Sequence, residues 1–344
     1  MKSSSSASSS SLTLRPRTLM SVGKKQSIVT GGAGFIGRNL VAALNQREED
    51  NIIIVDRLGQ DEKWKNLQGL RFDDFVDIDD FRARVRESGL PQTVTVFHLG
   101  ACSATTERDA DFLADNNYRY TRELCDACLK SGARFIYASS AATYGSGDLG
   151  YFDSDNMVPN LQPLNMYGFS KHMFDLWALR SGALAKIAGL KYFNVYGPHE
   201  DHKADMRSVV HKAFHQIQAT GEVTLFKSYK PDYKDGEQQR DFVHVKDAVA
   251  MTLYFYDKPE VNGLYNCGTG RARTWLDLAR AVFAALGKEP NIRFIDMPEH
   301  LRAKYQYFTQ ADMTKARAAG FDHDFASLEN GVKEYVQEYL LPRG

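Results

Sequence analysis

A glycine-rich turn constrains the fold of this chain more than any other feature. The segment Thr30–Gly37, TGGAGFIG, follows a short apolar run and opens a helical pattern over 35–44. A strand, a glycine turn and a helix in this order aim backbone N–H groups and the positive end of the helix at one point, which suits a pyrophosphate. Gly31 permits the tight turn, Gly34 lets the phosphate approach, and Gly37 lets the helix pack on the strand.

An acidic residue stands where a dinucleotide site needs one. The second apolar run, residues 51–55, ends in Asp56, which lies nineteen residues after Gly37. An acid at about this spacing faces the ribose of an adenosine. The order of elements therefore predicts a dinucleotide site and disfavours a turn without a ligand.

Three further residues indicate acid/base chemistry beside the dinucleotide site. Tyr167 and Lys171 are four apart and share one face of a helix, and Ser140 follows the apolar run 135–138. A phenol with a pKa of about 10 is a poor base at neutral pH, so we expect a nearby ammonium and a positively charged cofactor ring to lower it. The Tyr/Lys spacing alone fits an ordinary amphipathic helix. Together with Ser140 and the glycine turn it predicts an acid/base site.

Strand-like and helical patterns alternate along the first part of the chain. This alternation predicts an α/β fold, a doubly wound parallel sheet with helices on both faces and ligands at the carboxyl ends of the strands. Residues 74–77 are expected to follow the third strand and to lie near an adenine. The predicted strands cover residues 27–30, 51–55, 94–99, 134–138 and 189–195.

The pattern changes after about residue 197, which suggests three regions. Residues 1–25 form a Ser-rich extension, residues 26–197 a dinucleotide-binding domain, and residues 198–344 mainly a smaller substrate-binding lobe, with the chain crossing back between the lobes. Beyond a helix at 120–129, the later predicted helices cover 206–219, 246–257 and 274–286.

Composition excludes several classes of partner. The 43 Lys and Arg balance the 43 Asp and Glu, so nothing indicates a nucleic-acid surface or a polybasic membrane anchor. No apolar run is long enough to span a bilayer. The four cysteines include one C-x-x-C pair but no second pair for zinc, and they fit a reducing cytoplasm.

The first 25 residues are low in complexity and basic, with no acid before Glu48. Such a composition predicts disorder. It also resembles a transit peptide, but we favour a tail or an upstream start codon, with folding beginning near Met20.

Several longer segments carry a family resemblance that runs from about Gln26 to Leu341. These segments are His98–Glu107, Asp115–Tyr118, Ala138–Gly145, Tyr192–Pro198 with His202 and Lys203, Arg240–Val243 and Arg302–Asp312. Together with the glycine and Tyr/Lys motifs they resemble the extended short-chain dehydrogenase/reductase superfamily, which has a Rossmann-type fold. The segments around Cys102, Lys203 and Tyr305 narrow the resemblance to its ADP-L-glycero-D-manno-heptose 6-epimerases.

The resemblance implies a reaction and its partners. Such an isomerase inverts C-6 of ADP-D-glycero-D-manno-heptose by transient oxidation with bound NADP, and so supplies heptose for the lipopolysaccharide core. A homo-oligomer is also implied.

The resemblance also implies site residues, position by position. Tyr167 and Lys203 would be the acid/base pair, one on each face of the sugar carbon, with Lys171 and Ser140 assisting. Lys171 and Lys203 would also contact the cofactor. The other implied cofactor contacts are Gly31, Gly34, Phe35, Ile36, Gly37, Asp56, Arg57, Lys63, Leu99, Gly100, Ala101, Cys102, Ser103, Asn116 and Val195. The implied substrate contacts are Ser140, Asn194, Asp205, Lys212, Phe226, Lys227, Ser228, Arg240 and Tyr305.

The chain departs from the family pattern in places. Residues 229–237 look longer than usual, and Arg57, Asp205 and Lys212 replace a neutral residue, a serine and a histidine. Metal ligation is not predicted, although His199/His202 and His211/His215 have spacings that permit it.

Cofactor choice stays open on the residues alone. Asp56 favours a free ribose 2′-hydroxyl and repels a 2′-phosphate, which indicates NAD. Arg57 and Lys63 can neutralise that phosphate, which indicates NADP. The family resemblance tips the balance to NADP.

Two alternative functions remain. The first is another NAD(P)-dependent sugar-nucleotide epimerase or dehydratase, such as a UDP-galactose 4-epimerase. A dehydratase would want an acid just after Ser140, where this chain has Ala141 and Ala142. The second is a non-catalytic module that senses NADP, which has no need of Tyr167, Lys171 and Ser140 together.

Overall fold

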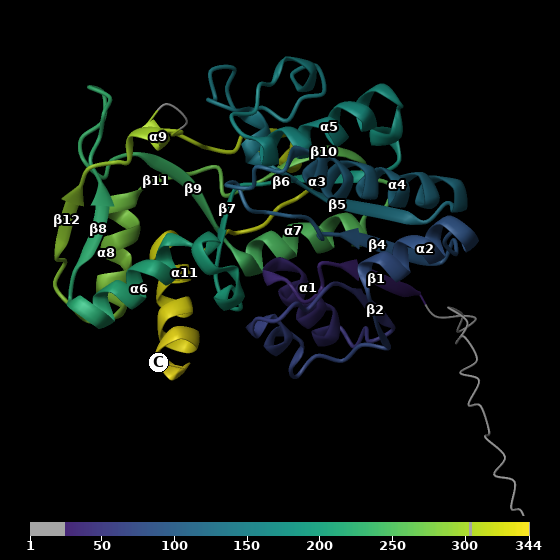
Figure 1. Cartoon of the computed structure of the whole chain (residues 1–344), viewed down its shortest axis with the longest axis horizontal. Helices are drawn as coiled ribbons and strands as arrows, with labels where there is room; N and C mark the ends of the chain where they lie inside the picture. The colour runs from purple at the N-terminus through teal and green to yellow at the C-terminus, as the bar shows by residue number, and fades with distance from the viewer. Residues whose placement is uncertain (1–24, 303–304, 344) are drawn as a thin grey trace, which may run out of the picture.

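A seven-stranded parallel sheet forms the centre of the molecule (Figure 1). The computed structural model describes residues 25–302 and 305–343, so the predicted Ser-rich extension lies outside the described residues except for Lys25. The strand order is β10-β6-β5-β4-β1-β2-β3. The strands are β1 (Gln26–Thr30), β2 (Ile52–Val55), β3 (Asp74–Val76), β4 (Val94–His98), β5 (Arg134–Ser140), β6 (Ala188–Tyr192) and β10 (Gly263–Cys267).

Helices cover both faces of this sheet, as the alternation of patterns predicts. One apolar core contains side chains of α1 (Phe35–Gln46) and α7 (Val245–Asp257). A second core contains side chains of α2 (Ile78–Ser88), α4 (Tyr120–Ser131) and α5 (Met166–Arg180). The strands β1, β2, β4, β6 and β10 are buried along their whole length, as expected for a parallel sheet with helices on both faces, whereas the edge strand β3 is partly exposed. The doubly wound, Rossmann-type fold is confirmed.

A smaller lobe with its own core lies beside the large sheet, on the left in Figure 1. A three-stranded sheet has the order β11-β9-β7, and β12 pairs with β8. The strands are β7 (Asn194–Tyr196), β8 (Val223–Phe226), β9 (Gln239–His244), β11 (Ala272–Thr274) and β12 (Ile292–Ile295). The helices that contribute to this core are α6 (Val209–Thr220), α8 (Trp275–Ala285), α11 (Leu328–Glu334) and its π-helical continuation η7 (Tyr335–Leu340).

The remaining short elements connect these layers. The chain returns to the large sheet after entering the smaller lobe, because α7 packs in a core of that sheet and β10 is one of its strands. The division of the chain at residue 197 stays a prediction. The short helices are α3 (Ala110–Leu113), α9 (Glu299–Arg302) and α10 (Thr314–Ala318), with the tighter turns η1 (Glu62–Leu67), η3 (Ala141–Tyr144) and η6 (Asp201–Met206).

Three sequence-based boundaries are wrong. The predicted strand 189–195 divides at Phe193, because β6 pairs with β5 whereas β7 pairs with β9 in the other sheet. The predicted helix 206–219 begins at Val209, since the Ser208 side chain accepts from the N–H of His211 and caps it. Residues 74–76 are the third strand itself rather than the segment after it.

Candidate active site

The glycine turn ends in an uncapped helix start. Gly31 has φ +70°, and a Cβ on Gly37 would lie 2.1 Å from the carbonyl oxygen of Gly31, so only glycine fits. The N-cap of α1, Gly34, has no side chain to accept from the first turn, whereas Ser208 caps α6 and Thr274 caps α8. The N–H groups at the start of α1 are thereby left for a ligand, which fits a pyrophosphate.

Asp56 is held at the end of β2 by three donors. Its carboxylate accepts from the backbone N–H groups of Ala33 (2.9 Å) and Arg57 (2.8 Å) and from the Lys63 ammonium (2.5 Å). The Arg57 guanidinium turns instead to Asp77 and Asp79, which raise its pKa. The Lys63 ammonium therefore neutralises the charge of the Asp56 carboxylate.

The segment after β4 forms a second wall of the site, directly beside the glycine turn. A Cβ on Gly100 would lie 3.0 Å from the Gly31 backbone nitrogen, so the two backbones approach closely. The buried Asn117 side chain accepts from the N–H of Cys102 and donates to its carbonyl, both at 2.9 Å, and donates to Ser170 on α5 at 3.0 Å. Asn117 therefore ties this wall to the helix that carries Tyr167. Asn117 lies in the family segment Asp115–Tyr118, but no role was predicted for it from the sequence.

Tyr167 and Lys171 lie on α5, which Asn165 caps at 2.8 Å through the N–H of Gly168. Burial raises the pKa of Tyr167, and a hydrogen bond with Ser140 opposes that rise. Burial also lowers the pKa of Lys171 to about 8, and its ammonium donates to the Ala138 carbonyl at 2.8 Å. The pKa of Tyr167 thus shifts upward, opposite to the direction expected from the sequence, because desolvation of the phenolate outweighs its stabilisation.

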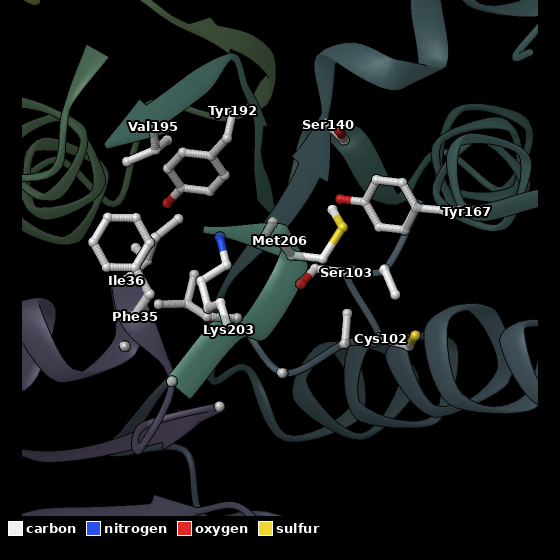
Figure 2. Close-up of a pocket in the computed structure, with 18 of the residues that line it drawn as sticks. Phe35, Ile36, Cys102, Ser103, Ser140, Tyr167, Tyr192, Val195, Lys203 and Met206 are labelled. Carbon is white, nitrogen blue, oxygen red and sulfur yellow. The ribbon is translucent and has the colours of Figure 1, made fainter. Parts of the chain in front are cut away.

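Lys203 reaches the same cavity from η6. Burial lowers the pKa of its ammonium, while the Glu200 carboxylate opposes this effect. The amine lies 5.1 Å from the centre of the Phe35 ring at the start of α1. In Figure 2, Lys203 enters from below and Tyr167 from the right, with their polar ends directed toward the middle, where Met206 lies between them.

One cavity of about 810 Å³ brings most of the predicted site residues together. Its lining also includes Met206, Tyr192 and Trp275, which were not predicted as site residues. Tyr192 opens the family segment 192–198, which is a signal that could have identified it, whereas Met206 and Trp275 lie in no such motif. The predicted residues that line it are Gly31, Gly34, Phe35, Ile36, Gly37, Asp56, Arg57, Lys63, Leu99, Gly100, Ala101, Cys102, Ser103, Asn116, Ser140, Tyr167, Lys171, Asn194, Val195 and Lys203.

A second, smaller cavity of about 150 Å³ holds Arg240 and Tyr305. The Arg240 guanidinium is buried, donates to the carbonyls of Gln239 (2.7 Å) and Gln306 (2.5 Å), and has no carboxylate partner among the described residues. Burial accordingly lowers its pKa. Trp275, which lines the larger cavity, donates to the Tyr305 hydroxyl at 2.9 Å and so joins the two cavities.

The other predicted substrate contacts line neither cavity. The exposed Lys212 donates to the backbone carbonyl of Asp205 at 2.6 Å, so the two residues that depart from the family pattern bind each other. The Phe226 ring packs edge-on against Tyr305. Lys227 pairs with Asp296, and the N–H of Ser228 donates to Asp235 within the longer 229–237 segment.

Two absences complete the description of residues 25–302 and 305–343. In this part of the chain no three His, Cys, Asp or Glu side chains come together as metal ligands. None of its helices combines the length and apolar character needed to cross a membrane.

Comparison with known proteins gives consistent matches. The sequence model of the NAD dependent epimerase/dehydratase family matches residues 27–268. An ADP-L-glycero-D-manno-heptose-6-epimerase of Nitratidesulfovibrio vulgaris (strain DP4) is 57% identical over 314 residues, which cover 91% of this chain and 97% of that protein.

Solved structures of similar enzymes share the fold. The ADP-L-glycero-D-manno-heptose-6-epimerase of Helicobacter pylori is 27% identical with a TM-score of 0.76, over 91% of this chain and 96% of that one. The UDP-glucose 4-epimerase of Thermus thermophilus, solved in complex with NAD, is 25% identical with a TM-score of 0.71, over 90% and 97%.

Proposed function

This chain belongs to the NAD dependent epimerase/dehydratase family, and on that premise we propose that it inverts C-6 of ADP-D-glycero-D-manno-heptose to give ADP-L-glycero-D-manno-heptose. It is an isomerase of the epimerase class. The relative that is 57% identical is named an ADP-L-glycero-D-manno-heptose-6-epimerase, and the match covers 97% of that protein. The cofactor is a nicotinamide dinucleotide, and we propose NADP.

One observation carries the proposal: Tyr167 and Lys203 direct their polar ends into a single cavity that also contains the glycine turn. Inversion at a carbon requires access to the substrate hydroxyl in two orientations. Two proton-transferring groups on different elements, α5 and η6, supply this access. A protein that only bound the dinucleotide would need neither of them.

The residues of this chain handle the protons. The C–H bond at C-6 is not acidic until a carbonyl forms, so the inversion has to pass through a ketone. When bound, the dinucleotide supplies the reversible hydride acceptor for this detour. One of Tyr167 and Lys203 accepts the hydroxyl proton as the ketone forms, and the other donates a proton after the sugar has turned over. Ser140 holds the phenol through its hydrogen bond.

The buried Arg240 guanidinium supports a sugar nucleotide as the substrate. A buried cation without a carboxylate partner is costly unless an anion completes the site. Two oxygens of a diphosphate match the fork of a guanidinium. The hydrogen bond from Trp275 to Tyr305 supports this proposal, because it links the cavity of Arg240 to the larger cavity.

The surroundings of Asp56 support NADP over NAD. Its two oxygens already accept from two backbone N–H groups and the Lys63 ammonium. A carboxylate so engaged has less capacity to accept from a free ribose 2′-hydroxyl. Lys63 both reduces the repulsion of a 2′-phosphate and brings a cation beside it.

Epimerisation in D₂O tests the proposed function. ADP-D-glycero-D-manno-heptose should convert to the L-glycero epimer with no deuterium at C-6, because Tyr167 and Lys203 exchange only hydroxyl protons with water. Proton NMR of the product measures both outcomes. Solvent deuterium at C-6 would rule out the transient ketone, and turnover of UDP-galactose in place of ADP-heptose would assign the chain to a different epimerase.

Variants of the two proton-transfer residues serve as controls. Tyr167→Phe and Lys203→Met should each reduce turnover by about 10²–10⁴-fold, the usual contribution of one general acid or base. Both variants should still bind the dinucleotide, which nicotinamide fluorescence can measure.

A further inference from the structure

The segment that carries Lys203 has an unusual backbone. Ala204, immediately after Lys203, has φ 45° and ψ −123°, and His199 at the start of the segment has φ 74°. Residues with a Cβ adopt such conformations only when their surroundings hold them there. Every residue of η6 is at least partly exposed, so an apolar face of its own does not hold the segment. Polar contacts with other elements must do so.

Two carboxylates anchor the segment to the smaller lobe. Glu200 accepts from the N–H and the hydroxyl of Ser208, at 2.5 and 2.6 Å. Asp201 accepts from the Tyr339 hydroxyl at 2.6 Å and lies 3.2 Å from His211. These bonds fix the segment against α6 and the C-terminal helices but not against the elements that bind the dinucleotide.

Asn66 makes the connection to the dinucleotide side. Its amide nitrogen lies 2.9 Å from the carbonyl oxygen of Ala33 in the glycine turn, 3.3 Å from that of His199 and 3.1 Å from Nδ1 of His202. The side chain is 6% exposed and does not line the cavity. On α1, Asn39 donates to the Pro198 carbonyl at 3.0 Å, one residue before the strained segment. Asn66 thus contacts residues within the strained segment, whereas Asn39 contacts the residue before it.

The chemistry of His202 agrees with this arrangement. An amide N–H₂ can only donate, so Nδ1 of His202 accepts and its proton lies on Nε2. Burial, together with the nearby Lys63 and Lys203 ammoniums, lowers the pKa of His202 to about 4, although the Asp61 and Asp56 carboxylates oppose this shift. The imidazole is therefore neutral near pH 7 and can accept the bond.

We propose that Asn66 is a positioning residue for Lys203. Its amide holds η6 against the glycine turn and η1, so that the Lys203 amine stays directed into the cavity. The helix η1 also carries Lys63, three residues before Asn66, so a single short element serves both the adenosine end of the site and the catalytic lysine. The proposal rests on the proposed function only for the part that Lys203 plays in turnover.

The chain offers a matched control in Asn45. This residue is 8% exposed and donates to the carbonyls of Glu49 (3.1 Å) and Arg71 (2.8 Å), at the end of α1 and away from the cavity. Asn66→Ala and Asn45→Ala each remove a buried amide with backbone partners. Asn66→Asp keeps the shape of the side chain but removes its donors, so it separates lost packing from lost hydrogen bonds.

The first measurement needs no substrate. The Lys203 amine is acetylated with acetic anhydride over a range of pH, and the modified peptide is quantified by mass spectrometry. In Asn66→Ala the midpoint of this pH profile should move up toward that of an exposed lysine, and the limiting rate at high pH should rise. In Asn45→Ala the profile should match that of the unchanged protein.

The second measurement is epimerisation. Asn66→Ala and Asn66→Asp should both lose about tenfold or more in kcat, since small misplacements of a catalytic group cost rates of this order. KM and the Kd for NADP should change by much smaller factors. A thermal melt of each variant checks that it is folded.

Three results would overturn the proposal: an unchanged acetylation profile in Asn66→Ala, a kcat in Asn66→Asp equal to that of Asn45→Ala, or a loss of kcat matched by an equal loss of NADP binding. Failure of the proposed function looks different. In that case the unchanged protein does not convert ADP-heptose, while the acetylation profiles still decide whether Asn66 positions Lys203.

Discussion

Burial favours the neutral form of three titratable side chains that line the larger cavity, Tyr167, Lys171 and Lys203. It raises the pKa of the Tyr167 phenol and lowers those of the Lys171 and Lys203 ammoniums. A neutral phenol can donate a proton, and a neutral amine can accept one. Desolvation thus shifts a phenol toward the form that donates a proton and an amine toward the form that accepts one, without a carboxylate.

The depressed pKa of Lys171 makes stability depend on pH. Its pKa falls from the usual 10.5 to about 8 in the folded chain. Between these values the unfolded chain binds more protons than the folded one, so folding becomes more favourable as pH rises. Below pH 8 the cost of burying the charge is fully present. At about 1.4 kcal/mol per pKa unit the cost is about 3 kcal/mol.

We therefore expect the free energy of unfolding of the cofactor-free protein, relative to that of Lys171→Met, to rise as pH increases from 8 to 10.5. Urea unfolding of both proteins at several pH values measures the difference. A difference that stays constant over this range would contradict burial of the ammonium.

Lys63 provides a test of cofactor choice. Lys63→Ala should weaken NADP much more than NAD, because only NADP carries the phosphate that the ammonium would bind. A charge-assisted contact of this kind is worth roughly 1.5–3 kcal/mol. Titration of the variant with each dinucleotide gives the two Kd values. Equal losses for both would show that Lys63 supports Asp56 alone.

At the scale of elements, the junction of β1 and α1 depends on close backbone contact. Gly37→Ala would place a Cβ 2.1 Å from the Gly31 carbonyl oxygen, so the helix has to move away from the turn that it opens. We expect loss of dinucleotide binding and a lower Tm, measured by fluorescence titration and a thermal melt.

Gly182→Ala separates the steric effect from backbone strain. Gly182 has φ +74° with no atom within 4 Å of its Cβ position, so alanine there costs only about 1–2 kcal/mol of conformational strain. It should leave dinucleotide binding intact. If both variants bind equally well, the contact between Gly37 and Gly31 is not needed for the site.

At the scale of the whole molecule, a buried ion pair connects the large sheet to the active-site helix. Asp175 on α5 and Lys191 on β6 are both 0% exposed, and their charged groups lie 2.7 Å apart. Asp175 also accepts from Tyr137 and Ser139 on β5, at 2.9 and 2.7 Å. These bonds hold α5 over the carboxyl ends of the strands, where Tyr167 and Ser140 meet.

Breaking this pair should be costly. Asp175→Asn leaves the Lys191 ammonium buried without a counter-charge, which typically costs about 3–5 kcal/mol. Asp257→Asn removes an exposed partner of Arg47 and should cost about 1 kcal/mol or less. Chemical unfolding of both variants measures the two values. If Asp175→Asn lowers the free energy of unfolding as little as Asp257→Asn does, another group compensates the charge of the Lys191 ammonium.

Features set by neighbours in sequence could be predicted from the chain itself. The glycine turn, the acid after β2 and the Tyr167/Lys171 spacing depend on the geometry of a single turn, helix or strand. The alternation of apolar runs and helical patterns required a doubly wound sheet, because buried parallel strands need helices on both faces. The resemblance of longer segments to a known family also predicted a role for Lys203. The polar residues around Lys203 in the sequence do not by themselves indicate such a role.

Features set by distant contacts were decided only by the tertiary structure. The run 189–195 reads as one strand, yet it divides at Phe193, because an apolar pattern does not specify which sheet a residue joins. Arg240 lies in a separate cavity, and Lys212 turns to the backbone of Asp205. The reach of Asn66 to His199 and His202 spans more than 130 residues of sequence. Spacing along a chain fixes contacts within one element, whereas contacts between elements depend on how their buried faces pack.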